Sequence, residues 1–66
     1  MTGTFGQRLR RIRKAQKLTQ KELAKKAGIN NMSISYYERD IEFPKISSLE
    51  WLCKALGVTA TELLGF

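Results

Sequence analysis

Hydrophobic residues recur along this chain at spacings of three and four, the repeat of an α-helix, and no segment keeps the alternation of a β-strand. Polar residues separate them into five groups: Phe5, Leu9 and Ile12; Leu23, Ala24 and Ala27; Ile34 and Tyr37; Leu49, Leu52, Cys53 and Leu56; Leu63 and Leu64. Each group predicts a short helix with one face turned toward a core. The pattern therefore predicts an all-α protein of five short helices.

Residues that can cap helix N-termini stand at the start of these groups. In a capping box, a Ser or Thr and a Glu or Gln three positions later each bond the other's backbone N–H. Asn is also a strong N-cap. The cap candidates are Thr4/Gln7, Thr19/Glu22, Asn30, Ser47/Glu50 and Thr59/Glu62. Gly28 and Gly57 stand where two helices would end, because glycine adopts the left-handed backbone of a helix C-terminus without strain. The predicted helices are 4–16, 19–27, 30–39, 46–56 and 59–64, with Pro44 in the irregular stretch before the fourth.

A chain of 66 residues is predicted to form one domain, residues 1–66. A domain this short buries only about 60% of its unfolded surface, so capped helices or self-association must add stability. One cysteine and no histidine exclude an internal disulfide and a His/Cys zinc site, which needs about four ligands. We therefore expect no metal and no cofactor.

The single thiol fits a reducing cytosol. No apolar run approaches the ~20 residues that span a bilayer. The first residues, MTGTFGQRLRR, lack the apolar segment of a secretory signal. We therefore expect a cytoplasmic protein without a membrane partner.

The net charge of +6 is unevenly distributed. Nine of the twelve basic residues lie between Arg8 and Lys26, where Glu22 is the only acid, whereas acids outnumber bases from Tyr36 onward. One cationic half suggests a polyanion as partner. Charge alone leaves a second interpretation open, namely a solvated cationic surface with no partner.

The second and third predicted helices are separated by only Gly28 and Ile29, so they must cross steeply and pack closely. Ala24 must then be small, because the third helix passes over it. The shared apolar seam would comprise Leu23, Ala27, Ile29, Ile34 and Tyr37. This is the pattern of a helix-turn-helix, here residues 20–39, with an ordinary helical hairpin as the alternative.

Residues 20–40 read QKELAKKAGINNMSISYYERD, which resembles the lambda-repressor-like helix-turn-helix family of phage repressors, Cro proteins and small bacterial regulators. The first helix, FGQRLRRIRKAQKLTQ, Pro44 and the ending CKALGVTATELLGF extend the resemblance over nearly the whole chain. It is most similar to the N-terminal DNA-binding domains of phage repressors. The resemblance implies a compact five-helix fold in a bacterial or phage-infected cell. It also implies a transcriptional repressor or regulator that binds double-stranded DNA at an operator.

In this family the third helix lies in the major groove with its N-terminal turn facing the base edges. The outward positions here are Asn31, Met32, Ser35 and Tyr36. Asn31 can both donate to and accept from an adenine edge, and Met32 would contact a thymine methyl. Ser35 and Tyr36 could bond a base or a phosphate, although Tyr36 could instead pack beside Tyr37.

Contacts with phosphates neutralise charge without reading sequence. Gln20 begins the second helix, where side chain and terminal N–H groups could bind one phosphate together. Asn30 is expected to cap the third helix with its backbone N–H near a phosphate. Cationic candidates are a stripe of Arg10, Lys14 and Lys17 on the first helix, and Arg39 and Lys45 beside the loop. Weaker candidates are Lys21, Lys25 and Lys26.

The resemblance further implies an ion pair between Arg13, on the apolar side of the first helix, and Glu38, at the end of the third. Such a pair would fix the recognition helix against the first helix. Two independent surface charges are the alternative.

Trp51 lies off the core face of its helix, so we expect it to be half exposed. It could pack along the rim of the domain. Alternatively, it could join Val58 and Phe66 in a weak homodimer, because family members dimerise through this end and palindromic operators need two copies. Cys53 is interpreted as a core residue rather than a redox site.

Other functions are less well supported. A protein-interaction module on the same fold, such as an antitoxin-type partner, would present an acidic or apolar third helix. An enzyme is not expected, because no histidine, nucleophile–base pair or phosphate loop is found, and no small-molecule substrate is evident. Phage repressor, restriction–modification controller and antitoxin all remain possible roles.

Overall fold

Five α-helices form the regular structure of residues 3–66, the part of the chain that the computed structural model describes. They are α1 (Phe5–Ala15), α2 (Gln20–Ala27), α3 (Asn31–Glu38), α4 (Ile46–Leu56) and α5 (Ala60–Leu64). The predicted ranges differ from these by at most one residue at an end, because the predictions included cap residues. The all-α, five-helix prediction is confirmed.

Three of the four predicted capping boxes are present, at Thr4, Thr19 and Thr59. Asn30 caps α3, where its side-chain oxygen accepts from the Met32 N–H at 2.7 Å. The predicted box at Ser47 is wrong. The N-cap of α4 is the extended Lys45, which gives no side-chain cap, and the helix has already begun at Ile46. Ser47 therefore lies inside the first turn, where its hydroxyl cannot take the capping position.

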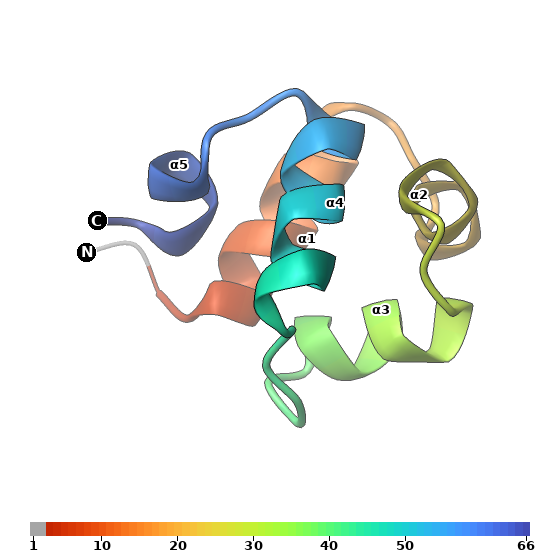
Figure 1. The fold of residues 1–66 in the computed structure, drawn as a ribbon, viewed down its shortest axis with the longest axis horizontal. Helices are drawn as coiled ribbons and strands as arrows, with labels where there is room; N and C mark the ends of the chain where they lie inside the picture. Colours follow the sequence, from red (N-terminus) through yellow and green to blue (C-terminus); the bar gives the residue numbers. More distant parts are fainter. Residues whose placement is uncertain (1–2) are drawn as a thin grey trace.

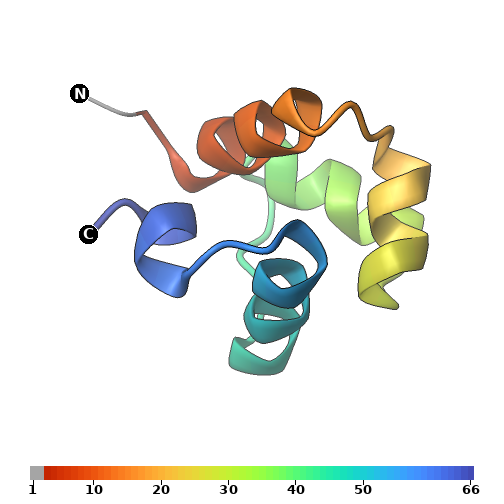
Figure 2. The ribbon, with the colours of Figure 1, turned by 90° about the horizontal axis from the view of Figure 1, so that it is seen from above.

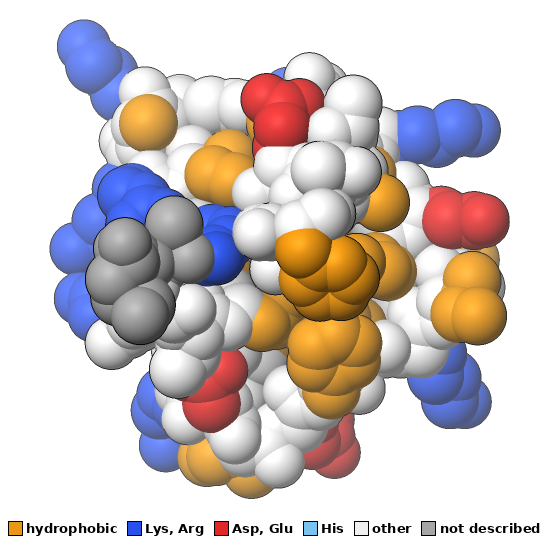
Figure 3. All heavy atoms as spheres, turned by 90° about the vertical axis from the view of Figure 1, so that its left-hand side faces the viewer, with side chains coloured by type: hydrophobic (Ala, Val, Ile, Leu, Met, Phe, Trp, Pro, Cys, Tyr) orange, Lys and Arg blue, Asp and Glu red, His pale blue; other side chains and the backbone are white. Residues whose placement is uncertain are grey.

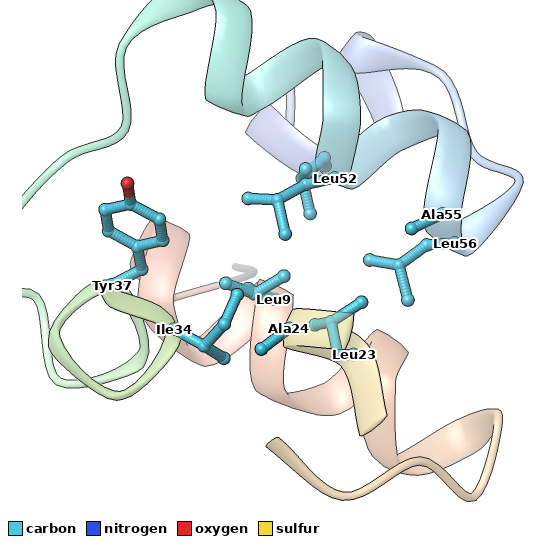
Figure 4. Packing of buried hydrophobic residues seen from close by; sticks show 9 residues of the cluster. Leu9, Leu23, Ala24, Ile34, Tyr37, Leu52, Ala55 and Leu56 are labelled. Carbon is cyan, nitrogen blue, oxygen red and sulfur yellow. The ribbon is translucent and has the colours of Figure 1, made fainter. Parts of the chain in front are cut away.

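The helices surround one core (Figures 1 and 2). Both views show α1 and α4 between α2 on one side and α5 on the other, with α3 running below α1 and joining α2 (Figures 1 and 2). Leucine and isoleucine side chains from α1, α2, α3 and α4 converge in the space between the helices (Figure 4). The fully buried side chains are Leu9, Leu23, Ile34, Leu52 and Leu63. Each lies on the helix face that the hydrophobic spacing predicts.

The turn between α2 and α3 has the geometry of a helix-turn-helix. Gly28 ends α2 with φ 71°, and Gly57 ends α4 with φ 67°. A Cβ at either glycine would meet no atom within 4 Å. The left-handed backbone, and not crowding, is therefore what favours glycine at these two positions. Ala24 is buried where α2 and α3 cross, as expected for a small residue.

Arg8 is buried on α1, although nothing in the sequence singles it out. Its guanidinium lies against Gly65, where an added Cβ would collide with it. It also lies within 3.5 Å of the Gly3 carbonyl oxygen. Arg8 thus joins the start of α1 to the end of α5.

Candidate nucleic-acid interface

The outward face of α3 carries the four residues predicted to contact bases. Asn31 and Met32 are exposed, Met32 by 60%, and Ser35 and Tyr36 are half-buried. All four border one shallow hollow of about 460 Å³ on the protein surface. The hollow is also lined by Gln20, Asn30 and Arg39. The structure therefore brings seven of the predicted contact residues onto one surface.

A second hollow, of about 540 Å³, lies where the end of α1 meets the starts of α2 and α3. Its predicted phosphate-binding residues are Lys14, Lys17 and Gln20, together with the weaker candidate Lys21, and Asn31 lies at its border with the first hollow. The N-termini of α2 and α3 both reach this region, and a helix N-terminus carries a partial positive charge. The lysine side chains and the helix N-termini thus both make this second hollow electropositive.

The expected stripe of Arg10, Lys14 and Lys17 is wrong as a helical feature. Helix α1 ends at Ala15, and Lys17 lies in the following turn with φ 60°. Lys17 still joins Lys14 at the second hollow, but Arg10 is exposed on α1 and lines neither hollow. Lys45 is exposed at the start of α4 and also lies outside both hollows.

Arg13 and Glu38 form an ion pair in which both carboxylate oxygens are used. Arg13 Nε donates to Oε2 at 2.6 Å and Nη2 donates to Oε1 at 2.9 Å. The two side chains are only 9% and 3% exposed. Arg13 Nη1 also donates to the Leu18 carbonyl oxygen at 2.8 Å. The pair therefore fixes α3 to α1 and to the turn before α2.

Gln20 completes this network, which the sequence analysis did not foresee. Its Nε2 donates to Glu38 Oε1 at 3.0 Å, so one carboxylate joins α1, α2 and α3. An amide carries two N–H groups, so the second remains available at the hollow. Sequence alone gives no sign of this bond, because the two residues are 18 positions apart and follow no helical repeat.

Tyr36 packs against Arg39. The Arg39 guanidinium carbon lies 5.4 Å from the centre of the Tyr36 ring, a cation–π distance. The two residues are three positions apart, a spacing that brings side chains together at a helix end. A predicted base contact and a predicted phosphate contact are therefore held as one unit.

A different surface lies around α4 and α5. Trp51 is 46% exposed, as expected, and borders an apolar groove of about 450 Å³ with Ile46, Leu49 and Cys53. Burial raises the pKa of the Cys53 thiol above its usual 9.0, and the negative charges of Glu50 and Glu62 add to this. The predicted dimer residues are not all together: Val58 is half-buried against the core and Phe66 is 85% exposed, and neither lines the groove. Hydrophobic side chains also gather in the middle of the face on the α5 side of the molecule (Figure 3).

Comparisons with known proteins agree with this architecture. The family model described as helix-turn-helix matches residues 9–63. The immunity repressor protein of Bacillus phage phi105 is 42% identical over 62 residues, which cover 94% of this chain and 43% of that protein. The transcriptional regulator ImmR of Bacillus subtilis is 39% identical over 62 residues, covering 94% and 49%. This chain thus spans about half the length of the curated relatives it matches.

Solved structures give the same result. The P22 c2 repressor, in complex with a synthetic operator, superposes with a TM-score of 0.89 at 38% identity over 96% of each chain. The restriction–modification controller protein C.AhdI from Aeromonas hydrophila has a TM-score of 0.88 at 33% identity over 91% of each chain. These proteins are named as repressors, regulators or controllers and not as enzymes.

Five helices, a steep α2–α3 turn and a polar outer face on α3 define a lambda-repressor-like helix-turn-helix domain. The chain belongs to the helix-turn-helix family. Within residues 3–66, none of the helices has the length and apolar character needed to cross a bilayer.

Proposed function

We propose that this domain binds double-stranded DNA sequence-specifically, with α3 in the major groove, and thereby represses or otherwise regulates transcription. The observation that carries the proposal is the outward face of α3. The proposed base-reading residues on this face border a surface that continues directly into the cationic hollow of α1 and α2. The P22 c2 repressor, solved on an operator, supports the proposal because its chain superposes over 96% of this one.

Asn31 and Met32 are the proposed readers of the first turn of α3. Both are exposed, so neither has to leave a packed position to reach a base. Asn31 would form a donor–acceptor pair with adenine, and the apolar Met32 would contact a thymine methyl. Ser35 and Tyr36 would act one turn further along the groove, where the Arg39 guanidinium holds the Tyr36 ring in place.

Phosphate contacts would flank these readers. Lys14, Lys17 and the free N–H of Gln20 converge where α2 begins, so one phosphate there would meet charge and helix dipole together. Lys45 would contact a second phosphate at the start of α4, where backbone N–H groups lack a side-chain cap. Arg10 would contribute at longer range, and Asn30 through its backbone. Arg39 would bind beside Tyr36.

We propose a weak homodimer on a palindromic operator in the cytoplasm, with the apolar groove at Trp51 as the contact. Two recognition helices must lie about 34 Å apart to enter successive major grooves. An exposed tryptophan beside an apolar groove is the kind of side chain that anchors protein interfaces. Val58 and Phe66 would act at the edge of this contact. A protein-interaction module without DNA binding is disfavoured, because the outer face of α3 is neither acidic nor apolar throughout.

Selection of bound duplexes from a random DNA pool tests the proposal. We expect one enriched site, read as two inverted half-sites. Asn31→Ala should cost about 1–3 kcal/mol on that site and relax the preference at one base pair. Lys14→Ala is the matched control, since it should weaken all duplexes nearly equally. A pool that shows no enrichment, or an Asn31→Ala variant that selects the unchanged site, would contradict the proposal.

A further inference from the structure

The chain leaves α3 through a residue in an unusual backbone conformation. Asp40 has φ 59°, and among the described residues only it and Lys17 have a positive φ without being glycine. A Cβ makes this left-handed conformation unfavourable, although Asp and Asn tolerate it better than most residues. Such a conformation persists where the surrounding structure holds it in place.

The Asp40 carboxylate is held at the start of α1. Its Oδ2 accepts from the Thr4 hydroxyl at 2.6 Å, and its Oδ1 accepts from the Gly6 N–H at 2.9 Å. Thr4 is also the N-cap of α1 and accepts from the Gln7 N–H, so Asp40 extends the capping box. The Gly6 N–H belongs to the first turn, where it has no partner within the helix and the dipole favours a negative group.

Gly6 marks a backbone-to-backbone contact at the same place. A Cβ on Gly6 would lie 2.6 Å from the carbonyl oxygens of both Tyr37 and Glu38 and 2.9 Å from the Asp40 carboxylate carbon. No side chain fits there, so the last turn of α3 touches the first turn of α1 directly. The negative end of one helix therefore meets the positive end of the other.

The end of α3 is thus attached to α1 at two separate points. Glu38 bonds Arg13 near the end of α1, and Asp40 bonds Thr4 and Gly6 at its start. Core packing of Ile34 and Tyr37 also holds α3, and two polar attachments at different points of α1 constrain the angle between the helices more tightly than one would. That angle determines where the outer face of α3 stands relative to Lys14 and Lys17.

We propose that Asp40 is a positioning residue for DNA recognition: by bonding the start of α1, its carboxylate sets the angle at which α3 presents its reading face. Asp40 acts through α1 and does not itself contact DNA. This inference rests on the proposed function, because it concerns how α3 is oriented for binding DNA.

Two substitutions of Asp40 and one control substitution test this contact. Asp40→Gly removes the carboxylate while accommodating the positive φ, so the fold is retained. Asp40→Asn keeps an acceptor oxygen for the Gly6 N–H and tolerates the same backbone. Glu42→Gln is the matched control, since it removes one negative charge from the same exposed loop and leaves the bonds of Asp40 to Thr4 and Gly6 in place.

The first readout is affinity for the duplex most enriched from a random pool by the unsubstituted 66-residue chain. We expect Asp40→Gly to bind it about tenfold more weakly, the size of effect that a residue outside the contact exerts by moving a contact element. Asp40→Asn should restore most of this loss and Glu42→Gln should show none. A gain in affinity for every duplex in Asp40→Asn and Glu42→Gln alike would overturn the proposal, because the loop acids would then act only by repelling phosphate.

The second readout needs no DNA. Amide exchange of Gly6 and residual dipolar couplings of α1 and α3 are measured on the same variants. We expect Asp40→Gly to lose Gly6 protection and to change the α1–α3 angle, and Asp40→Asn to retain both. An unchanged angle in Asp40→Gly overturns the positioning role. If the unsubstituted chain enriches no duplex, the proposed function fails, and the couplings still decide whether Asp40 sets the angle.

Discussion

The two sides of this small domain use opposite kinds of chemistry. On the α2–α3 side, polar side chains are held by bonds to one another, as in the Arg13–Glu38–Gln20 network. On the α4–α5 side, large hydrophobic side chains stand in solvent, among them Ile46 at 77% exposure. The first side is arranged before any ligand arrives, which favours recognition of a polar, charged surface. The second side gains from being covered, which favours contact with another protein.

The buried ion pair is where this arrangement can be broken most severely. Glu38→Ala leaves the Arg13 guanidinium buried without its carboxylate, which we expect to cost about 3–5 kcal/mol in the free energy of unfolding. Denaturant unfolding measures the loss. Glu50→Ala, an exposed acid on the α4 side, should stay within about 0.5 kcal/mol. A Glu38→Ala loss as small as the Glu50→Ala loss would mean that the α2–α3 side is not held in place by this pair.

The exposed tryptophan tests the other side. Trp51→Ala should weaken self-association by about 2 kcal/mol, or about thirtyfold in dimer Kd, because a central aromatic anchor carries much of an interface. Sedimentation equilibrium measures it. Met32→Ala removes a comparably exposed hydrophobic side chain from α3 and should leave self-association unchanged. Equal effects from both substitutions would abolish the distinction between the two sides.

A smaller effect is expected at the cationic hollow. Affinity for DNA should fall with salt at a log–log slope of about −0.9 per neutralised phosphate, and Lys14→Ala should make that slope shallower by about one phosphate. Lys25 lies outside the hollow, so Lys25→Ala should change the slope less. Fluorescence titrations at several salt concentrations measure both. A slope that Lys14→Ala leaves unaltered would remove Lys14 from the phosphate contacts.

The contrast between the sides also explains what the sequence could predict. Helix positions follow from hydrophobic spacing and caps, which are local signals, so α1 to α5 lie within a residue of their predicted ends. The predicted cap at Ser47 is wrong because α4 begins at Ile46, directly after the extended Lys45, so Ser47 is already inside the helix. The pair of Arg13 with Glu38 came from family resemblance and not from spacing.

Contacts that join distant segments had no signal in the chain. Thr4 and Asp40 are 36 positions apart, and the bond between them depends on a left-handed backbone that periodicity does not encode. Gln20 bonds Glu38 because the folded helices converge there, and the same convergence creates the cationic hollow. The outward residues of α3 could thus be named from the sequence as candidates, but of the bonds that hold this surface together only the Arg13–Glu38 pair was predicted.

The smallest expected effect concerns Cys53, at the apolar groove. Burial first, and then Glu50 and Glu62, raise the pKa of its thiol above 9.0 in the folded state, so the fold favours the neutral thiol. The unfolded chain ionises at lower pH, and this contribution to stability is therefore present below about pH 9 and lost as the pH rises beyond it. Urea unfolding of the unsubstituted chain and of Cys53→Ser, compared from about pH 7 to pH 10, isolates the thiol from the other titrating groups. We expect the stability difference between the two chains to shrink as the pH rises. A difference that stays constant would mean that folding does not raise the pKa of this thiol, and the contrast between the two sides would not extend to this residue.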